Sequence, residues 1–194
     1  MALTESTMLA LGTAAPEFRL TDVVSGRTVS LADFKDQQAL LVMFICRHCP
    51  YVQHIKSELA RLGRDYVGKP VGIVAISAND AAAYPDDAPE SLNEFARAEK
   101  LAFPLCYDDT QAVAVAYTAA CTPDFFVFDR TRRLAYRGQL DDSRPGNGKP
   151  ATGRDLRAAL DAVLAGTAPS ASQRPSVGCN IKWKPGREPA YFSR

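Results

Sequence analysis

The stretch Phe44-Ile45-Cys46-Arg47-His48-Cys49-Pro50-Tyr51 decides the fold. It lies where an apolar run, 39–46, gives way to a segment whose apolar residues recur at helical spacing. Two cysteines, two residues apart, therefore stand at a predicted strand-to-helix turn. If Cys46 caps the helix, the unpaired amides and the positive end of the helix dipole favour its thiolate. The thiolate is the species that attacks disulfides, and Cys49, one turn along, is close enough to resolve a mixed disulfide.

The spacing C-x-x-C also fits half of a zinc site, a structural disulfide or two buried thiols. A zinc site needs two more ligands at metal spacing, and the sequence contains no second cysteine pair. The two histidines are His48, between the cysteines, and His54. The strand before the pair and the helix after it favour a redox pair, and we predict neither a resident metal nor a cofactor.

Composition limits the classes of partner and compartment. The 194 residues carry a net charge of +1, which argues against a nucleic-acid partner. No apolar run approaches the roughly 20 residues of a transmembrane helix, and the N-terminus lacks the basic region of a secretory signal. Five cysteines are an odd number, unlike the disulfide framework of a secreted domain. We therefore expect a cytoplasmic protein without a membrane partner; the sequence does not indicate its oligomeric state.

Two apolar runs, 39–46 and 71–77, flank a helix predicted from about Cys49 to Gly63. Runs that are apolar at nearly every position are typical of parallel strands buried on both faces, so this segment predicts a right-handed βαβ unit. A short hairpin is predicted around the Ser25-Gly26 turn, and a second hairpin joins 124–129 to 133–140.

Helix signals mark the remaining elements. Ser91 with Glu94, and Thr152 with Asp155, have the spacing of capping boxes, and Thr110 is predicted to cap a helix from Gln111 to about Ala119. Gly166 closes the last helix. We predict one domain, 1–166, and a C-terminal extension, 167–194, that packs on or alongside it, because the extension contains four residues that disordered tails rarely hold. These residues are Cys179, Trp183, Tyr191 and Phe192.

The order strand, C-x-x-C, helix, strand, helix, Thr-Pro, hairpin, helix resembles the thioredoxin fold over roughly 15–165. Ala-Pro-Glu-Phe at 15–18 and Asp-Phe-Phe-Val-Phe-Asp at 124–129 resemble the redoxin branch that contains the AhpC/TSA proteins. Longer motifs resemble bacterial thioredoxin-like proteins often described as peroxiredoxin-like; they lie at 46–52, 137–145 and 178–186. The resemblance implies a three-layer α/β/α sandwich with a mixed central sheet, an N-terminal hairpin extension and a C-terminal tail.

The same resemblance implies roles at single positions. Cys46 would be the nucleophile and Cys49 the resolving cysteine. Pro123 would be the cis-proline that faces them, and Thr122 would offer its backbone to an extended substrate segment. His48 matches the histidine before the second cysteine in protein disulfide isomerase, where positive charge favours the thiolate and makes the pair more oxidising.

Arg47 is expected to act in the same direction as His48. Two departures from the thioredoxin pattern stand out. Ile45 replaces the tryptophan that precedes the first cysteine, and the preceding strand carries no buried acid. Proton transfer then falls to another group, for which Glu17, Lys35 and water are candidates. The loops at 79–80 and 141–144 follow strands and are expected to border the cleft.

Three functions remain open. The first is a thiol–disulfide oxidoreductase that acts on protein or small-molecule disulfides and thiols, with an upstream thiol reductant. The second is a peroxidase in which Cys46 reacts and Cys49, Cys121 or Cys179 resolves. The third is a soft-metal protein that holds Cu(I) with Cys46, Cys49 and His54.

The peroxidase hypothesis departs from its family pattern, because Pro123 stands where a peroxiredoxin has its arginine. The remaining cysteines have simpler alternatives. Cys121 is expected near the rim of the site, either as a buried thiol or as a partner in an alternative disulfide. Cys106 is expected in the core, and Cys179 is expected in a tail that crosses the molecule without pairing to Cys46.

Overall fold

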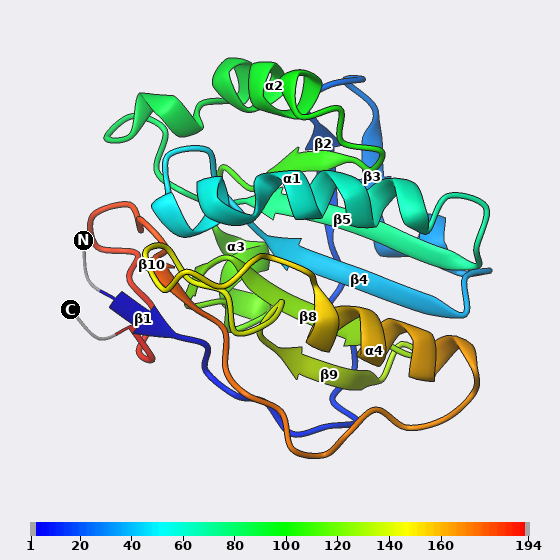
Figure 1. Cartoon of the computed structure of the whole chain (residues 1–194). Coiled ribbons are helices and arrows are strands. Elements are labelled where there is room, and N and C mark those ends of the chain that lie inside the picture. Colours follow the sequence, from blue (N-terminus) through cyan, green and yellow to red (C-terminus); the bar gives the residue numbers. More distant parts are fainter. Residues whose placement is uncertain (1–2, 193–194) are drawn as a thin grey trace.

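The structure is a computed structural model that describes residues 3–192 (Figure 1). The strands of its main sheet are β2 (Arg19–Asp22), β3 (Thr28–Ser30), β4 (Ala39–Phe44), β5 (Val71–Ser77), β6 (Leu105–Tyr107), β8 (Asp124–Phe128) and β9 (Leu134–Gly138). Their order across the sheet is β3-β2-β6-β5-β4-β8-β9. β4 runs parallel to β5 and antiparallel to β8, so the sheet is mixed. The two predicted hairpins are confirmed as β2–β3 and β8–β9, and β5 has the predicted bounds.

Helices cover both faces of this sheet. On one face lie α1 (Pro50–Asp65), α2 (Pro89–Ala98) and α4 (Arg154–Leu164), and on the other lies α3 (Ala112–Ala116). Alternate residues of β4 divide between the faces: Leu41 and Met43 pack with α1, whereas Val42 and Phe44 pack with α3. The predicted three-layer sandwich is therefore confirmed, and β4 is apolar throughout because both of its faces are buried.

α1 begins within one residue of its predicted start, but its cap differs from the one suggested. Cys49 is the N-cap, with φ −71° and ψ 123°, and Pro50 is the first helical residue. Proline suits this position because its missing N–H would be unpaired there, but its ring keeps the preceding residue out of the helical region. The prediction that Cys46 caps α1, with Cys49 in the first turn, was therefore wrong. The segment 46–49 is a non-helical loop that ends at the helix.

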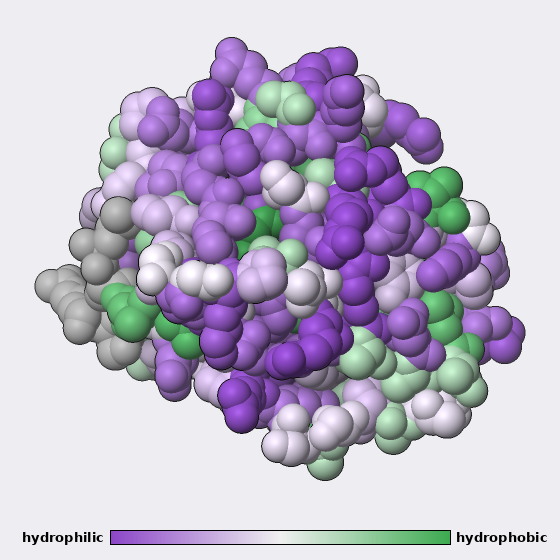
Figure 2. Space-filling model, in the orientation of Figure 1, coloured by the Kyte–Doolittle hydropathy of each residue, from purple (hydrophilic) through white to green (hydrophobic). Residues whose placement is uncertain are grey.

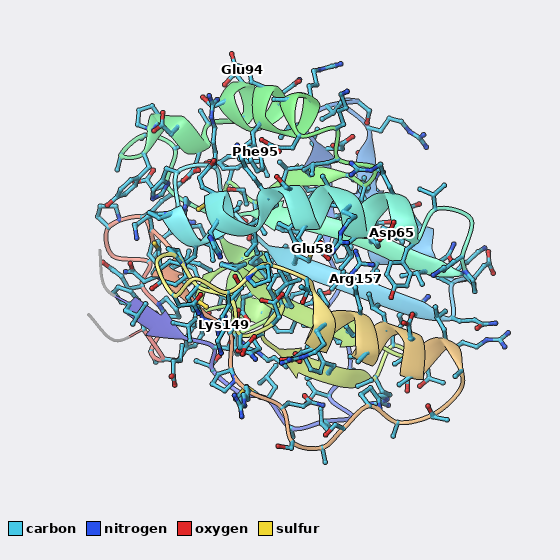
Figure 3. The ribbon with its side chains drawn as sticks, viewed as in Figure 1. Glu58, Asp65, Glu94, Phe95, Lys149 and Arg157 are labelled. Atoms are coloured by element: carbon cyan, nitrogen blue, oxygen red, sulfur yellow. The ribbon has the colours of Figure 1, made fainter. Side chains whose placement is uncertain are left out.

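A buried carboxylate fixes α1 against α4, as Figure 3 shows. Glu58 of α1 is nearly inaccessible to solvent and accepts from Nε of Arg61 at 2.6 Å and from Nε of Arg157, on α4, at 2.8 Å. Arg157 also reaches Asp65, the last residue of α1, at 2.9 Å. Both partners of Glu58 are charged, so its burial is compensated, and these bonds hold the helix that carries the C-x-x-C loop at a fixed distance from α4.

The caps of three helices also differ from the prediction. α2 begins at Pro89 with Ala88 as N-cap, and Ser91 Oγ donates instead to the carbonyl of Pro85 at 3.1 Å. Before α4, Thr152 donates to the carboxylate of Asp141, and Gly153 becomes the N-cap with φ +68°. The N-cap of α3 is Gln111 and not Thr110, and this helix spans five residues and ends at Ala116, short of the predicted end. At α2 a proline, and at α4 a tertiary contact, outweighed the local capping pattern.

The C-terminal extension adds a second, small sheet. β10 (Val177–Asn180) pairs antiparallel with β1 (Leu3–Glu5) on one side and with β7 (Cys121–Thr122) on the other. Farther along, Ile181 and Trp183 join the core cluster of the α3 face. The extension thus packs on the rest of the molecule within the described residues; the domain boundary at residue 166 stays a prediction.

The surface over α1 and α4 is mostly hydrophilic (Figure 2), as expected for helices that turn one apolar face to a sheet. No helix within residues 3–192 has the length and apolar character needed to cross a membrane.

Candidate active site

The loop after β4 brings two cysteines to one threonine. Cys46 Sγ lies 3.2 Å from Thr122 Oγ1, and Cys49 Sγ donates to the carbonyl oxygen of Thr122 at 3.1 Å. The peptide between Thr122 and Pro123 is cis, as predicted. Four of the residues singled out in the sequence are therefore brought together, although 72 positions separate Cys49 from Cys121, the first residue of β7.

A carboxylate that the sequence did not single out holds the C-x-x-C loop. Asp87 lies at the end of η2 (Pro85–Asp87), and its side chain is inaccessible to solvent. Its Oδ1 accepts from the main-chain N–H of Arg47 at 2.7 Å and from that of His48 at 3.2 Å. Its Oδ2 accepts from Nδ2 of Asn79 at 2.7 Å and pairs with Nδ1 of His48. Asp87 supplies the buried acid that the preceding strand lacks.

The ion pair between His48 and Asp87 shifts both pKa values. The bond to Asp87 raises the pKa of His48 above its usual value, against the effect of burial. Burial opposes the charge of Asp87, but the bonds from His48 and Asn79 outweigh it and lower the pKa of Asp87. The imidazole stacks on the ring of Tyr84 at 5.3 Å between centroids. A cationic imidazole beside a dithiol favours the thiolate, as the sequence led us to expect of His48.

The two thiols titrate as a pair. Hydrogen bonds from the thiols of Cys179 and Cys46 lower the pKa of Cys49, whereas burial raises the pKa of Cys46. A hydrogen bond between two thiols favours one thiolate and opposes a second one beside it. The carbonyl of Thr122 opposes charge on Cys49, and the hydroxyl of Thr122 can donate to Cys46. The second contact favours Cys46 as the carrier of the thiolate.

Cys179 is the third sulfur of the site. It lies on β10 directly opposite Thr122 in the strand register, and its thiol hydrogen-bonds Cys49. The three sulfurs share one core cluster, and none is more than 5 % exposed. The site is therefore closed to bulk solvent in the arrangement that the structure shows.

Other predicted residues lie away from the sulfurs. The Arg47 side chain turns toward α2, where it donates to the carbonyl of Ser91 and to Glu94, each at 2.9 Å. Its guanidinium thus stabilises the loop's position by contacts outside the dithiol. Glu17 and Lys35 are exposed, and Lys35 precedes β4 at the end of that strand remote from Cys46, so neither suits proton transfer to the dithiol.

Two cysteines are buried without such neighbours. Cys106 lies in the core of the α3 face, where burial raises the pKa of its thiol to about 12. Cys121 donates to the carbonyl of Pro123 at 3.5 Å, and burial raises its pKa as well.

His54 contacts Ser143 Oγ at 2.6 Å, which connects α1 to the loop at 141–144. Asn79, in one of the loops expected to border the cleft, donates to Asp87.

The residues that could bind a metal ion in the structure differ from the predicted set. Cys46, His48 and Asp87 each offer one ligand atom, and these atoms lie within 4.8 Å of one another. His48 and Asp87 are engaged with each other, so a metal would have to break their ion pair. The predicted copper ligand His54 is not part of this group.

Comparison with known proteins places the chain in a family. Residues 11–137 match the AhpC/TSA family. The chain belongs to the AhpC/TSA family. A Mycobacterium tuberculosis (strain H37Rv) protein provisionally named a peroxiredoxin is 29 % identical over 117 residues, which are 60 % of this chain and 69 % of that protein.

Solved structures give the fold. An uncharacterized conserved protein from Geobacillus kaustophilus is 54 % identical, with a TM-score of 0.93 over 95 % of this chain and 98 % of that one. A hypothetical protein from Sinorhizobium meliloti 1021 is 51 % identical, also with a TM-score of 0.93, over 94 % of this chain and 100 % of that one. The thioredoxin domain of a Bacteroides vulgatus thiol-disulfide oxidoreductase is 21 % identical, with a TM-score of 0.59 over 77 % of this chain and 97 % of that one. This AhpC/TSA protein therefore has the predicted thioredoxin-like fold.

Proposed function

We propose that the protein is a thiol–disulfide oxidoreductase that works through Cys46 and Cys49. The observation that carries the proposal is the convergence of both sulfurs on Thr122, beside the imidazole of His48 and the buried carboxylate of Asp87. Disulfide exchange needs a thiolate, a second thiol within reach and a means of stabilising the charge, and these groups supply all three.

In the reducing direction, the Cys46 thiolate attacks one sulfur of a substrate disulfide, and the other sulfur leaves as a thiolate that takes up a proton. Cys49 then attacks Cys46 Sγ, so that the mixed disulfide breaks and the Cys46–Cys49 disulfide forms. The substrate gains two electrons, which an upstream thiol reductant returns to the pair. The oxidising direction is the reverse of these steps.

His48 and Asp87 are assigned to the electrostatics of these steps. The imidazolium stabilises the thiolate before attack, and stabilising the reduced form makes a dithiol more oxidising. Asp87 keeps the imidazole charged and fixes the loop through the main-chain N–H groups of Arg47 and His48. The His48–Asp87 ion pair thereby changes the redox potential of the dithiol without contacting the substrate.

Access is the remaining requirement, because Cys46 is 1 % exposed and Cys49 is inaccessible. Small thiols and disulfides need only a slight opening of the loop, whereas a protein disulfide needs room along Thr122. We therefore expect small-molecule disulfides to react faster than folded protein disulfides.

The test is a direct comparison of substrates. The reduced protein is assayed for turnover of oxidised glutathione, of insulin disulfides and of hydrogen peroxide under the same reductant. The proposal predicts turnover of disulfides that Cys46→Ser and Cys49→Ser abolish and that Cys106→Ala, in the core of the opposite face, retains. Turnover of peroxide alone would contradict it.

A peroxidase is the second candidate, favoured by the AhpC/TSA match and by the name of the Mycobacterium tuberculosis relative. The positions of the arginine side chains argue against a peroxidase. The buried guanidinium of Arg137 binds Asp124 and Thr118 on the α3 face, and that of Arg47 binds Glu94. A neutral Thr122–Pro123 segment faces the sulfurs instead, so we expect peroxide to react slowly.

Soft-metal binding is the third candidate, and the set Cys46, His48 and Asp87 is the observation behind it. Metal analysis of protein purified under reducing conditions separates it from exchange chemistry. Stoichiometric copper that Cys46→Ser removes would support it, and metal-free protein with full disulfide turnover would exclude it.

A further inference from the structure

Cys49 has two other cysteines as neighbours. Its sulfur accepts from the thiol of Cys46, in the same loop, and from the thiol of Cys179, which lies on β10 opposite Thr122 and belongs to the same core cluster. Cys46 is held in addition by the hydroxyl of Thr122 at 3.2 Å. A disulfide at Cys49 can therefore be reached from two directions, from the loop after β4 and from β10.

β10 is fixed closely enough to Thr122 for Cys179 to keep this position. Cys179 is paired with Thr122 across the β7–β10 ladder. At Gly178 a Cβ would stand 2.0 Å from the carbonyl oxygen of Thr122, so only glycine permits the approach. Ser176 Oγ donates to the carbonyl of Pro123 at 2.7 Å, just before the strand. The carbonyl of Thr122 thus contacts both Cys49 and the backbone beside Cys179.

The position of β10 has a second consequence. In the thioredoxin-like arrangement, the backbone beside the cis-proline is where an extended substrate segment was expected to pair. Here a strand of the same chain pairs with that backbone and presents a cysteine to the dithiol. The tail occupies the place of a substrate and carries the sulfur that a substrate would bring.

We propose that Cys179 is a third redox cysteine, which receives the disulfide from the Cys46–Cys49 pair. This inference rests on the proposed function, because it needs the Cys46–Cys49 disulfide as its starting state. The Cys179 thiolate attacks Cys49 Sγ, the Cys49–Cys179 bond forms, and the Cys46–Cys49 bond breaks with Cys46 leaving as a thiolate. The proton of Cys179 passes to Cys46 or to solvent, and the step involves no net oxidation.

The exchange changes what the protein can do. Cys46 becomes a thiol again while the chain remains oxidised, so the enzyme can attack a further substrate sulfur. The new disulfide ties β10 to the N-terminus of α1, across the backbone of Thr122. Protein segments are then kept from pairing there, and small-molecule disulfides and thiols are the substrate class that the locked form admits.

The test is time-resolved mapping of disulfides in the full chain. Reduced protein is mixed with oxidised glutathione, quenched in acid at intervals, blocked with N-ethylmaleimide and digested with trypsin. Cleavage after Arg47 puts Cys46 and Cys49 on different peptides, so each pairing gives its own mass. The relay predicts that Cys46–Cys49 forms first and that Cys49–Cys179 then replaces part of it, while Cys46 becomes reactive to N-ethylmaleimide.

Variants separate the relay from its starting state. Cys179→Ala should form only the Cys46–Cys49 bond, and Cys106→Ala should keep the wild-type order of bonds. Gly178→Val should displace β10 and lose the Cys49–Cys179 bond while it keeps the Cys46–Cys49 bond; a cooperative denaturant transition like that of the wild type shows that the domain has folded.

Two outcomes would overturn the relay in distinguishable ways. If Cys46–Cys49 forms and Cys49–Cys179 is absent at every time and glutathione ratio, the relay is wrong and the proposed function stands. If neither bond forms, both are wrong.

Discussion

Two ion pairs of this protein each contain a buried carboxylate. They lie at opposite sides of the sheet, and they differ in what surrounds them. Arg137 and Asp124 are both inaccessible, 3.1 Å apart, on the α3 face. His48 and Asp87 lie beside the dithiol, where the imidazole keeps 15 % of its side-chain exposure. The cation of the first pair is a guanidinium, which is not a titratable group near neutral pH. The second contains the side chain whose ordinary pKa lies closest to neutrality.

The residues around Arg137 support the same distinction between the two pairs. Around Arg137 stand Thr7 and Thr118 as hydrogen-bond acceptors, and the guanidinium lies over the ring of Phe126 at 4.4 Å. The charges of Asp124 and Arg137 act in opposite directions on the buried thiol of Cys121. Both carboxylates are buried, but only His48 can change its charge near neutral pH, and this titratable partner beside the dithiol is what distinguishes the two pairs.

The largest expected effect comes from breaking the structural pair. Asp124→Ala leaves a buried guanidinium unpaired, which should lower the free energy of unfolding by about 3–5 kcal/mol. Arg137→Met should cost less, because burial already raises the pKa of Asp124 and the carboxyl can become neutral. Denaturant unfolding measures both. Equal costs for the two variants would contradict the account.

Disrupting the His48–Asp87 pair should lower the free energy of unfolding less than disrupting the Arg137–Asp124 pair does, but it should lower disulfide turnover more. Asp87→Asn removes the charged acceptor of two main-chain N–H groups in the C-x-x-C loop, a loss of about 1.5–3 kcal/mol. Disulfide turnover should fall as well, because the loop and the imidazole lose their support. Asp86→Asn, at the exposed neighbouring position, is the matched control. Unchanged turnover in Asp87→Asn would remove this carboxylate from the site.

The pH dependence of stability should reveal the same pair. His48 has a raised pKa in the fold, so its contribution is complete below the ordinary value near 6.5 and is lost as pH rises through the raised value. Asp87 has a lowered pKa, so its contribution is complete above the ordinary value near 3.8 and is lost as pH falls through the lowered value. The pair should therefore stabilise the fold most between these two ordinary values. Urea unfolding of the wild type and of Asp87→Asn at a series of pH values measures the difference.

The imidazole titration can be followed by NMR, in which His54 provides the reference signal. The signal of His48 should titrate above 6.5 in the wild type and move to lower pH in Asp87→Asn. A signal for His48 that does not respond to Asp87→Asn would contradict the ion pair.

The smallest effect is expected at the solvent-exposed end of the α1–α4 contact. Asp65 is half exposed and meets Arg157 at 2.9 Å, so Asp65→Asn should cost less than about 1 kcal/mol. Glu58→Gln, at the buried end of the same network, should cost more. If Asp65→Asn lowered the free energy of unfolding more than Glu58→Gln, burial would not determine how much these contacts stabilise the fold.

The sequence predicted the frame of the site through its strong patterns. The apolar runs predicted β4 and β5, and the spacing of apolar residues predicted α1. The cis-proline was implied by the resemblance to the thioredoxin fold. α1 begins within one residue of the predicted start, but the suggested cap at Cys46 does not form, because Pro50 keeps Cys49 out of the helical region.

The remaining parts depended on contacts that no local pattern encodes. Asp87 lies in a loop rich in alanine, aspartate and proline, 38 positions after Cys49, and its neighbour Asp86 is exposed. Which of the two is buried is decided by tertiary packing. The tail was expected to pack on the domain, but its register, with Cys179 opposite Thr122, is set by the close approach of Gly178.

The most direct measurement of the central claim is a redox titration of the full chain across glutathione buffers, with the disulfides mapped at each point. The account predicts a reversible disulfide between Cys46 and Cys49 with a potential between about −270 and −120 mV, the range of known dithiol enzymes. The absence of that bond, or a bond from Cys46 to Cys121 or Cys179 in its place, would contradict it.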